Sequence, residues 1–382
     1  MRSVMKVATA VALVGLTATA CGSKPASSGS TGASGTSGNS PSAATSPSSS
    51  TGGTGGGTAS GNALKACMVL DTGGVDDRSF NESSWNGMQG AHQANSNIKV
   101  SYVSSNSQND YVPNLNAEVN KGCDTVLAVG GLMADAVKTT AKKNPKTHFA
   151  EVDAPSSGPN VYGLQYNTAQ AAFLGGYLAA AMSKTGKVAT YGGLNIPPVT
   201  IYMDGFWEGV QYYNKQKGKN VQVLGWNEKN QKGGTFAQSF TDQNKGRSIT
   251  QAFQQQGADI VFPVAGSTGL GSGAAAQAAG GKLNLIWVDT DGCESASQYC
   301  QYFVTSVTKG ITKSVEQYLK QSSDGKFPTG NYIGTLKNDG VGLAPFHQFD
   351  SKVPSDVKKE LDSLKSDIIS GKIKITSPAQ PK

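Results

Sequence analysis

Residues 66–81 read ACMVLDTGGVDDRSFN, an apolar run followed by an acidic, glycine-rich turn. The apolar run has the length of a buried strand. Gly73 and Gly74 permit a sharp turn, and Phe80 and Asn81 open a helical stretch. A buried strand that leads through a glycine turn into a helix is the repeating unit of an α/β fold, so this segment predicts that class.

Expected strands and helices alternate along the chain in two rounds. The first has strands at 66–70, 98–103, 125–129 and 148–152 and helices at 79–95, 111–121 and 134–143. The second has helices at 168–183, 201–216, 245–256 and 273–279 and strands at 187–191, 221–225, 260–264 and 283–288. Because the strands are continuous apolar runs separated by helices, we expect two lobes, each a doubly wound parallel sheet.

The segments after residue 300 are too few to form a third core. A helix at 312–321 and strand-like stretches at 332–336 and 340–344 must return to the two lobes, which predicts a multi-crossover hinge. The expected division is an N-terminal lobe of 63–164 plus 301–325, a C-terminal lobe of 165–300 plus 326–348, and a C-terminal helix and tail at 349–382. The apolar stripe that predicts this last helix is Val353, Val357, Leu361, Leu364 and Ile368.

The first 21 residues, MRSVMKVATAVALVGLTATAC, have the pattern of an export signal. Arg2 and Lys6 precede an apolar stretch, and small residues lead to Cys21. This resembles a bacterial lipoprotein signal peptide with Cys21 as the acylated residue, which places the protein on the extracytoplasmic face of the cell membrane. Because Ala18 stands where leucine is commonest, the alternative is ordinary cleavage nearby and a secreted protein.

Residues 22–62 are almost wholly Gly, Ser, Thr, Ala, Pro and Asn, with Lys24 as their only charge. Such a stretch cannot bury enough apolar surface to offset its ordering entropy, so we expect a disordered tether. It holds part of the 48 glycines of the 382-residue chain. A coil of about 40 residues spans ~35 Å on average, enough to hold a domain clear of a membrane.

The formal net charge of +7 does not indicate a nucleic-acid partner, because the lysines are scattered and no basic stripe with interleaved aromatics occurs. Charged residues make up only 15% of the chain, which argues against a coiled coil. Beyond residue 21, no apolar run reaches the ~18–20 residues of a transmembrane helix.

The chain has five cysteines, and lipidation of Cys21 would leave four, which allow three pairings. Cys293 and Cys300 bracket a short polar loop, which favours a disulfide between them and leaves Cys67 to pair with Cys123. No C-x-x-C motif occurs, and the three histidines are far from any cysteine in the sequence, so no metal site is predicted.

Acidic residues and glycines follow the expected strands in both rounds. Asp71 and Asp153 follow strands of the first round, while the glycine-rich loop 265–273 and the pair Asp289 and Asp291 follow strands of the second. Ligands of open parallel sheets bind outside the carboxyl ends of the strands. Because carboxylates accept hydrogen bonds from hydroxyls and repel phosphate, the pattern favours a neutral, hydroxyl-rich ligand. Any one of these aspartates alone is explained as well by a helix cap or turn.

The sequence motifs give little support for an enzyme function. Residues 269–274, GLGSGA, loosely fit a dinucleotide fingerprint, but the loop comes late in the second round, and an exported protein has little access to NAD. No G-x-S-x-G elbow occurs, and no histidine follows an expected strand to serve as base of a Ser-His-Asp triad. Paired carboxylates can cleave a glycosidic bond, so a nucleoside hydrolase is the enzyme alternative. We expect a protein without catalytic residues or a cofactor.

Seven motifs occur in the order typical of one family. They are DTGGVDDRSFNESSWNGM (71–88), AQAAFLGGYLAAAMSKTGKVATYGG (169–193), GADIVFPVAGSTGLG (257–271), WVDTDG (287–292), TSVTK (305–309), KNDGVGLAP (337–345) and IISGKIKI (368–375). The chain from about 66 to 375 thereby resembles the basic membrane protein family, the purine-nucleoside-binding lipoproteins of ABC transporters. The resemblance implies a type I periplasmic-binding-protein fold that holds a nucleoside between its lobes.

The resemblance also implies roles for individual residues. In the family two aromatic side chains sandwich the base; Phe80 matches the first, and Phe240 best matches the second. The chain is longer than the usual pattern before Phe240, so Trp226 and Phe236 are alternatives for the second aromatic.

Polar residues match the rest of the implied nucleoside site. Asn81 and Asp153 match positions that select the base. Positions that hold the ribose match Asp71, the backbone of Gly266, Asp291 and Lys309, with Lys313 as an alternative to Lys309.

These observations lead to one main hypothesis and two of other classes. The main hypothesis is a monomeric solute-binding lipoprotein that captures a nucleoside, with purines favoured, and delivers it to an ABC permease. A sugar or another small polar solute is the alternative ligand. The other classes are a surface sensor or adhesin on the same fold and the nucleoside hydrolase.

Overall fold

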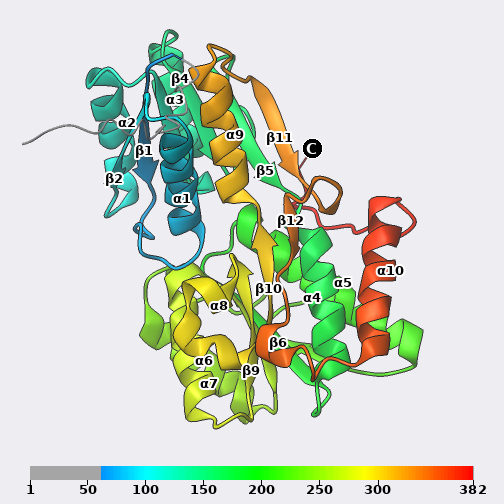
Figure 1. Cartoon of the computed structure of the whole chain (residues 1–382). Coiled ribbons are helices and arrows are strands. Elements are labelled where there is room, and N and C mark those ends of the chain that lie inside the picture. Colours follow the sequence, from blue (N-terminus) through cyan, green and yellow to red (C-terminus); the bar gives the residue numbers. More distant parts are fainter. Residues whose placement is uncertain (1–61, 382) are drawn as a thin grey trace, which may run out of the picture. The chain divides into compact units, whose positions relative to one another are not determined.

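Two six-stranded sheets carry the fold (Figure 1). The computed structural model describes residues 62–381, so the expected signal segment 1–21, Cys21 and the expected tether up to residue 61 lie outside the described residues. In the first sheet, of order β11-β5-β4-β3-β1-β2, all strand pairs are parallel. Its strands are β1 (Leu64–Leu70), β2 (Ile98–Ser104), β3 (Thr125–Val129), β4 (His148–Val152), β5 (Val161–Tyr166) and β11 (Gly330–Gly334).

The second sheet repeats this arrangement in the order β12-β10-β9-β8-β6-β7. Its strands are β6 (Lys187–Gly192), β7 (Gln222–Leu224), β8 (Ile260–Val264), β9 (Asn284–Asp289), β10 (Phe303–Lys309) and β12 (Val341–Leu343). All pairs are parallel except β12, which runs antiparallel to β10. Position by position, β1, β3, β4 and β5 correspond to β6, β8, β9 and β10. The predicted α/β class with two parallel sheets is confirmed.

Helices cover both faces of each sheet. In the first lobe, α1 (Phe80–Ala94) and α9 (Ile311–Ser323) pack on one face, and α2 (Tyr111–Asn120) and α3 (Ala134–Lys143) on the other. In the second lobe, α4 (Thr168–Met182) and α5 (Pro197–Lys217) face α6 (Gln243–Gln255) and α7 (Gly269–Ala278) across the sheet, and short α8 (Gly292–Ser295) follows β9. Within the described residues, no helix is both long and apolar enough to cross a membrane.

Two differences from the predicted elements have local causes. Helix α5 begins at Pro197 rather than near residue 201, because prolines tolerate the first turn of a helix, where backbone N–H groups need no partner. Strand β5 was not predicted, because its sequence VYGLQY mixes apolar, glycine and polar residues. It pairs with β4 and β11 and ends at Tyr166, where the chain first leaves the first sheet.

The chain passes between the sheets three times, between Tyr166 and Thr168, Lys309 and Ile311, and Gly334 and Val341. This agrees with the expected multi-crossover hinge but corrects the expected division. The segment of β10, which was not predicted as a strand and was expected in the first lobe as part of 301–325, pairs with β9 in the second sheet. Strand β11, expected in the second lobe within 326–348, pairs with β5 in the first. Its sequence GNYIG is short and half-exposed, as an edge strand of either sheet can be, so the pattern could not assign it.

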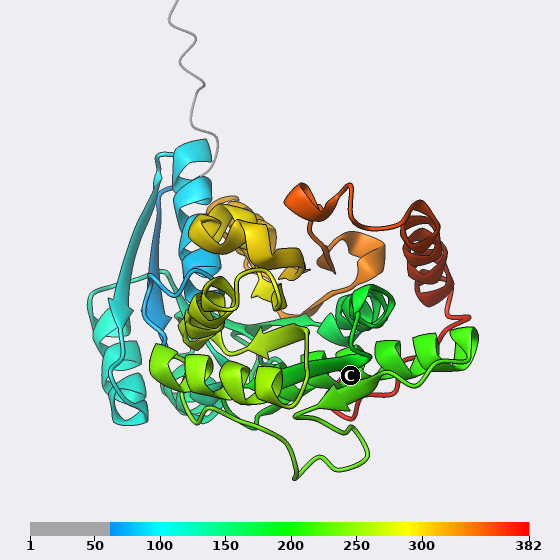
Figure 2. The ribbon, with the colours of Figure 1, turned by 90° about the horizontal axis from the view of Figure 1, so that it is seen from below.

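The C-terminal helix and both disulfides agree with the sequence. Helix α10 (Ser355–Ile369) begins just after Pro354, and four residues of the predicted stripe within it are buried against the second lobe. Figure 2 shows α10, in red, beyond α4 at the edge of this lobe. Cys67 in β1 is bonded to Cys123 just before β3, and Cys293 is bonded to Cys300. The disulfide pairing inferred from proximity is therefore confirmed.

Glu151, in the middle of β4, is fully buried on the face that packs against α2 and α3. Neither of its carboxylate oxygens has a hydrogen-bond partner within residues 62–381. Burial, helped by the charge of Asp135, raises the pKa of Glu151 to about 8. In the unfolded chain the pKa is near 4.5, so the folded state binds this proton more tightly and loses stability as the pH rises from about 4.5 to 8.

Substitution Glu151→Gln is therefore expected to flatten the pH dependence of stability. Between pH 5 and pH 8, the variant should lose less free energy of unfolding than the wild type by roughly 2–4 kcal/mol. Urea unfolding at both pH values measures the difference, and Glu316→Gln on α9 is the control. Equal losses in wild type and Glu151→Gln would show that Glu151 does not bind this proton in the folded state.

Candidate functional site

A cavity lies where the carboxyl ends of strands from both sheets meet. The residues around it enclose about 570 Å³ of space, counting the part open to solvent. Its first-lobe lining residues are Asp71, Gly73, Asp77, Phe80, Asn81, Gly130, Gly131, Leu132 and Asp153. Its second-lobe lining residues are Ile196, Pro198, Val199, Tyr202, Phe240, Val264, Ala265, Gly266, Asp289 and Lys309. This is the location that the strand-end rule predicts.

The cavity brings together most of the residues singled out from the sequence, with Asp291 as the exception. The Oδ1 atom of Asp291 accepts the backbone N–H of Cys293 at 2.9 Å, and Oδ2 lies 2.7 Å from Nε2 of His347. Asp291 therefore caps α8, and it is not among the cavity residues. Asp289, the last residue of β9, lines the cavity in its place, since the strand ends there.

The three aromatic candidates for the second face of a base lie in different places. Trp226 is buried and donates its Nε1–H to Asp204 at 2.9 Å. Phe236 packs edge-on against Trp226, with ring centroids 5.9 Å apart. Phe240 lines the cavity, whereas neither Trp226 nor Phe236 does. Phe240 therefore remains the candidate for the second aromatic.

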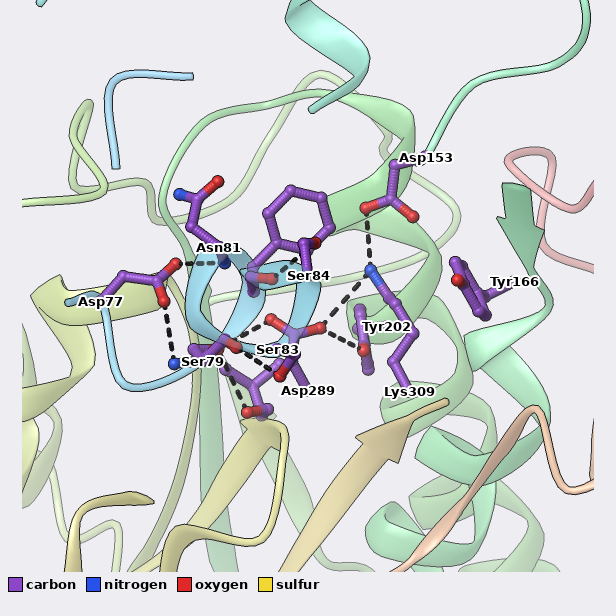
Figure 3. Close-up of polar contacts among 12 residues, drawn as sticks. Asp77, Ser79, Asn81, Ser83, Ser84, Asp153, Tyr166, Tyr202, Asp289 and Lys309 are labelled. Atoms are coloured by element: carbon purple, nitrogen blue, oxygen red, sulfur yellow. Dashed lines mark hydrogen bonds and ion pairs between the residues drawn. The ribbon is translucent and has the colours of Figure 1, made fainter. Parts of the chain in front are cut away.

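Lys309 at the end of β10 joins carboxylates of both lobes (Figure 3). Its Nζ lies 2.8 Å from Oδ2 of Asp153 and 3.4 Å from Oδ1 of Asp289, and the side chain is 3% exposed. Burial alone would lower the pKa of Lys309, but the two carboxylates outweigh burial and leave it raised, so the side chain stays cationic. The ammonium also lies 4.9 Å from the centroid of the Phe80 ring. The alternative Lys313 is exposed on α9.

Two residues that the sequence did not single out complete the surroundings of Asp289. The Ser79 hydroxyl donates to Oδ2 of Asp289 at 2.8 Å, and the Tyr202 hydroxyl donates to Oδ1 at 2.6 Å. Ser79 stands directly before Phe80 in the first motif, so its position next to a predicted site residue could have identified it. Tyr202 lies inside α5, away from any strand end, and carried no such signal.

Asp77 fixes the start of α1, which carries two of the cavity residues. Its Oδ1 accepts the backbone N–H groups of Ser79 at 3.0 Å and Glu82 at 3.1 Å, and its Oδ2 accepts that of Asn81 at 2.9 Å. Burial outweighs these bonds and raises the pKa of Asp77 to about 7. An aspartate just before a helix is a common capping signal, which could have identified Asp77.

Asp71 and Asn81 form a buried pair beside this cap. Asp71 Oδ1 accepts the Asn81 amide at 3.0 Å and the Gly73 N–H at 2.9 Å. Burial raises the pKa of Asp71 despite both bonds. The Asn81 Oδ1 atom is buried and has no hydrogen-bond partner among the described residues. Because the other end of its amide is fixed by Asp71, this oxygen is available to accept a donor from a ligand.

Comparison with known proteins adds a family to this geometry. The Bmp family, described as "ABC transporter substrate-binding protein PnrA-like", matches residues 64–378. The chain belongs to this family. It is therefore a substrate-binding protein of an ABC transporter, and its partners include a ligand and the permease subunits of that transporter.

The chain is similar to individual members over most of their length. It is 31% identical over 333 residues to the "ABC transporter nucleoside-binding protein BmpA" of Lactococcus lactis subsp. cremoris, which covers 82% of this chain and 89% of that protein. It is 32% identical over 339 residues to the "CD4+ T-cell-stimulating antigen" of Listeria monocytogenes, with 84% and 90% covered.

A solved structure supports the fold. An ABC transporter solute-binding protein from Aeropyrum pernix K1 superposes with a TM-score of 0.75 at 25% identity, covering 82% of this chain and 94% of that one. The expected type I periplasmic-binding-protein fold is thereby confirmed.

Replacing Lys309 is expected to leave Asp153 and Asp289 buried without a cation. At pH 7.5, Lys309→Met should lower the free energy of unfolding by roughly 3–5 kcal/mol, the usual cost of breaking a buried ion pair. The loss should shrink at pH 5, because burial raises the pKa of Asp153 and this carboxylate then takes up a proton more readily. Urea unfolding measures both values, with exposed Lys313→Met as a control expected within about 0.5 kcal/mol of wild type. A pH-independent loss would contradict the role of the two carboxylates.

Proposed function

We propose that this substrate-binding protein captures a neutral nucleoside, with purines favoured, and delivers it to its ABC permease. The observation that carries the proposal is one cavity bordered by phenylalanines from both lobes, Phe80 and Phe240, together with buried carboxylates. Flat aromatic rings suit the faces of a base, and carboxylates suit the hydroxyls of a sugar. The name of the Lactococcus relative, a nucleoside-binding protein, supports the same ligand class.

In this proposal the base lies between Phe80 and Phe240. Stacking accepts every base, so selection falls to polar atoms at the edge of the base. Among the described residues that line the cavity, Asn81 Oδ1 is the buried acceptor with no protein partner, and it would accept an N–H group of the base. Asp153 is the other candidate for the base, although its Oδ2 already accepts from Lys309.

The sugar would lie against the remaining polar groups. Asp71 and Asp289 each carry carboxylate oxygens at the cavity, and the backbone of Gly266 borders the same space. Gly266 has φ of +54°, a conformation that a glycine adopts without strain. Lys309 would donate to a ribose oxygen while it holds the two lobes' carboxylates. Asp289 takes the role that the sequence had suggested for Asp291.

Charge favours a nucleoside over a nucleotide. Among the described residues that line the cavity, Asp71, Asp77, Asp153 and Asp289 are acidic, and the one cationic side chain is Lys309. Since Lys309 already pairs with two of these carboxylates, a phosphate would meet repulsion without a compensating cation.

Titration calorimetry of the purified protein with inosine, guanosine, adenosine and cytidine tests the ligand class. We expect binding well below millimolar for at least one purine nucleoside, and weaker binding of free ribose and of the corresponding nucleotide. Tight binding of free ribose would favour the sugar alternative, and absence of binding below about millimolar for all four nucleosides would refute the proposal. Release of free base during overnight incubation would identify a hydrolase instead.

Removing one aromatic face is expected to weaken binding without unfolding the protein. Phe80→Ala should raise the dissociation constant for the best nucleoside about 10- to 100-fold, since base stacking on an aromatic is worth ~1–3 kcal/mol. Phe236→Leu is the matched control, because Phe236 packs on Trp226 outside the cavity. Equal affinity of Phe80→Ala and wild type would remove the stacking assignment.

We also propose that the protein is anchored to the extracytoplasmic face of the cell membrane through a lipid on Cys21. The support is the signal pattern that ends at this cysteine. Cys21→Ser should abolish incorporation of labelled fatty acid and shift the protein from the membrane fraction to the soluble or secreted fraction. Unchanged labelling in this variant would contradict the assignment.

A further inference from the structure

A short segment of the first lobe bonds directly to the end of β9 in the second lobe. The segment is 77–79, between the glycine turn after β1 and the start of α1. The Ser79 hydroxyl donates to Oδ2 of Asp289 at 2.8 Å and lies 3.3 Å from the carbonyl oxygen of Val288. The Trp287 Nε1–H donates to the carbonyl of Arg78 at 3.4 Å. Consecutive residues on both sides thus contact one another across the cleft.

The side chains that make these contacts are buried. Ser79 and Trp287 are fully buried, and Asp289 is 7% exposed. A buried carboxylate or hydroxyl that loses its partner costs free energy, so separation of the lobes would have to hydrate all of them. The contacts therefore favour the closed arrangement in the protein itself.

Backbone strain occurs on both sides of the contact. Arg78 has φ of +58° and Asp289 has φ of +65°, in the left-handed region that non-glycine residues rarely occupy. Such conformations persist only where surrounding contacts hold them. The backbone of Arg78 is held by the hydrogen bonds of the next residue, Ser79, to Asp77 and Asp289. The backbone of Asp289 is held by the hydrogen bonds of its own side chain to Ser79 and Tyr202.

We propose that residues 77–79 and 287–289 form a clasp that holds the two lobes closed before ligand binds, with Ser79 as the residue that couples closure to the site. The Ser79 N–H is fixed by Asp77 and its hydroxyl by Asp289, and the next two residues are Phe80 and Asn81, which line the cavity. When the clasp forms, the ring and amide that face the ligand are set in place. Ser79 is a positioning residue in this scheme and contacts no ligand itself.

Helix α1 offers a matched control for removal of the Ser79 hydroxyl. Ser84 is also buried on α1, but its hydroxyl donates within the helix to the carbonyl of Phe80 at 3.1 Å and makes no contact across the cleft (Figure 3). Ser79→Ala and Ser84→Ala therefore delete the same atom, the first from the residue just before α1 and the second from within α1, and only the first variant breaks the clasp.

Hydrogen exchange of the full-length protein without ligand tests the clasp. Ser79→Ala should raise exchange at least threefold in the peptides covering 77–84 and 287–292 together, although they are about 200 residues apart in sequence. Ser84→Ala should leave 287–292 at the wild-type rate. Small-angle scattering should show a larger radius of gyration for Ser79→Ala alone. A folded Ser79→Ala protein with wild-type exchange at 287–292, or equal effects of both variants there, would overturn the proposal.

A kinetic measurement with inosine adds a second readout. Ser79→Ala should release inosine about fivefold faster than wild type, the factor expected for one hydrogen bond, and Ser84→Ala should not. This arm rests on the proposed nucleoside ligand. Failure of wild type and of both variants to bind inosine, guanosine, adenosine or cytidine would refute the nucleoside proposal, while the ligand-free exchange experiment would still decide whether the clasp exists.

Discussion

The structure depends on one ammonium group placed between two carboxylates that come from different lobes. Asp153 and Asp289 are drawn into a space from which water is largely excluded, and neither charge is tolerable there alone. Lys309 reaches both, and it comes from the last residue of β10, beside the point where the chain crosses back to the first lobe. The ion pairs of Lys309 with these two carboxylates therefore fix the distance between the lobes on the side of the cavity where the chain crosses between them. It also holds a cation over Phe80, so the ring that would face a base is fixed by the same group.

Asp153 and Asp289 occupy equivalent positions in the two lobes because the two sheets have the same topology. Strand β4 in the first sheet corresponds to β9 in the second, Asp153 follows β4 directly, and Asp289 ends β9. Both have left-handed backbone conformations, with φ of +70° and +65°. When two like sheets face each other across a hinge, equivalent strand ends converge on one space, and like charges converge with them. A single lysine between the two resolves a repulsion that the repeated topology creates.

The repeated topology explains how much of the fold and of the candidate site could be predicted from the sequence. The two rounds of strands and helices, and the rule that ligands bind at strand ends, were enough to predict the class and to place Asp71, Asp153 and Gly266 at one cavity. The family motifs added Phe80, Asn81, Phe240 and Lys309, which line the same cavity. Strand pairing across the crossovers could not be predicted, because β10 and β11 carry no signal for the sheet they join. The choice between Asp289 and Asp291 depended on where β9 ends, a boundary that apolar patterning defines only to within a few residues.

Tyr202 shows the deeper limit of sequence reasoning about this site. It lies within α5, which packs against α4, and nothing in its neighbourhood along the chain marks it as polar or functional. Its role depends on the approach of Asp289 from another part of the same lobe, so it exists only in the folded protein. Because buried polar and charged groups need hydrogen-bond partners, the groups that already have partners also indicate what a ligand must supply. Tyr202, Ser79 and Lys309 already bond to Asp289, whereas Asn81 Oδ1 has no partner in the part of the chain that the structure describes. The carboxylate of Asp289 therefore needs no counter-ion from a ligand, whereas the amide oxygen of Asn81 needs a hydrogen-bond donor. This difference is the strongest physical reason to expect an uncharged ligand with an N–H group.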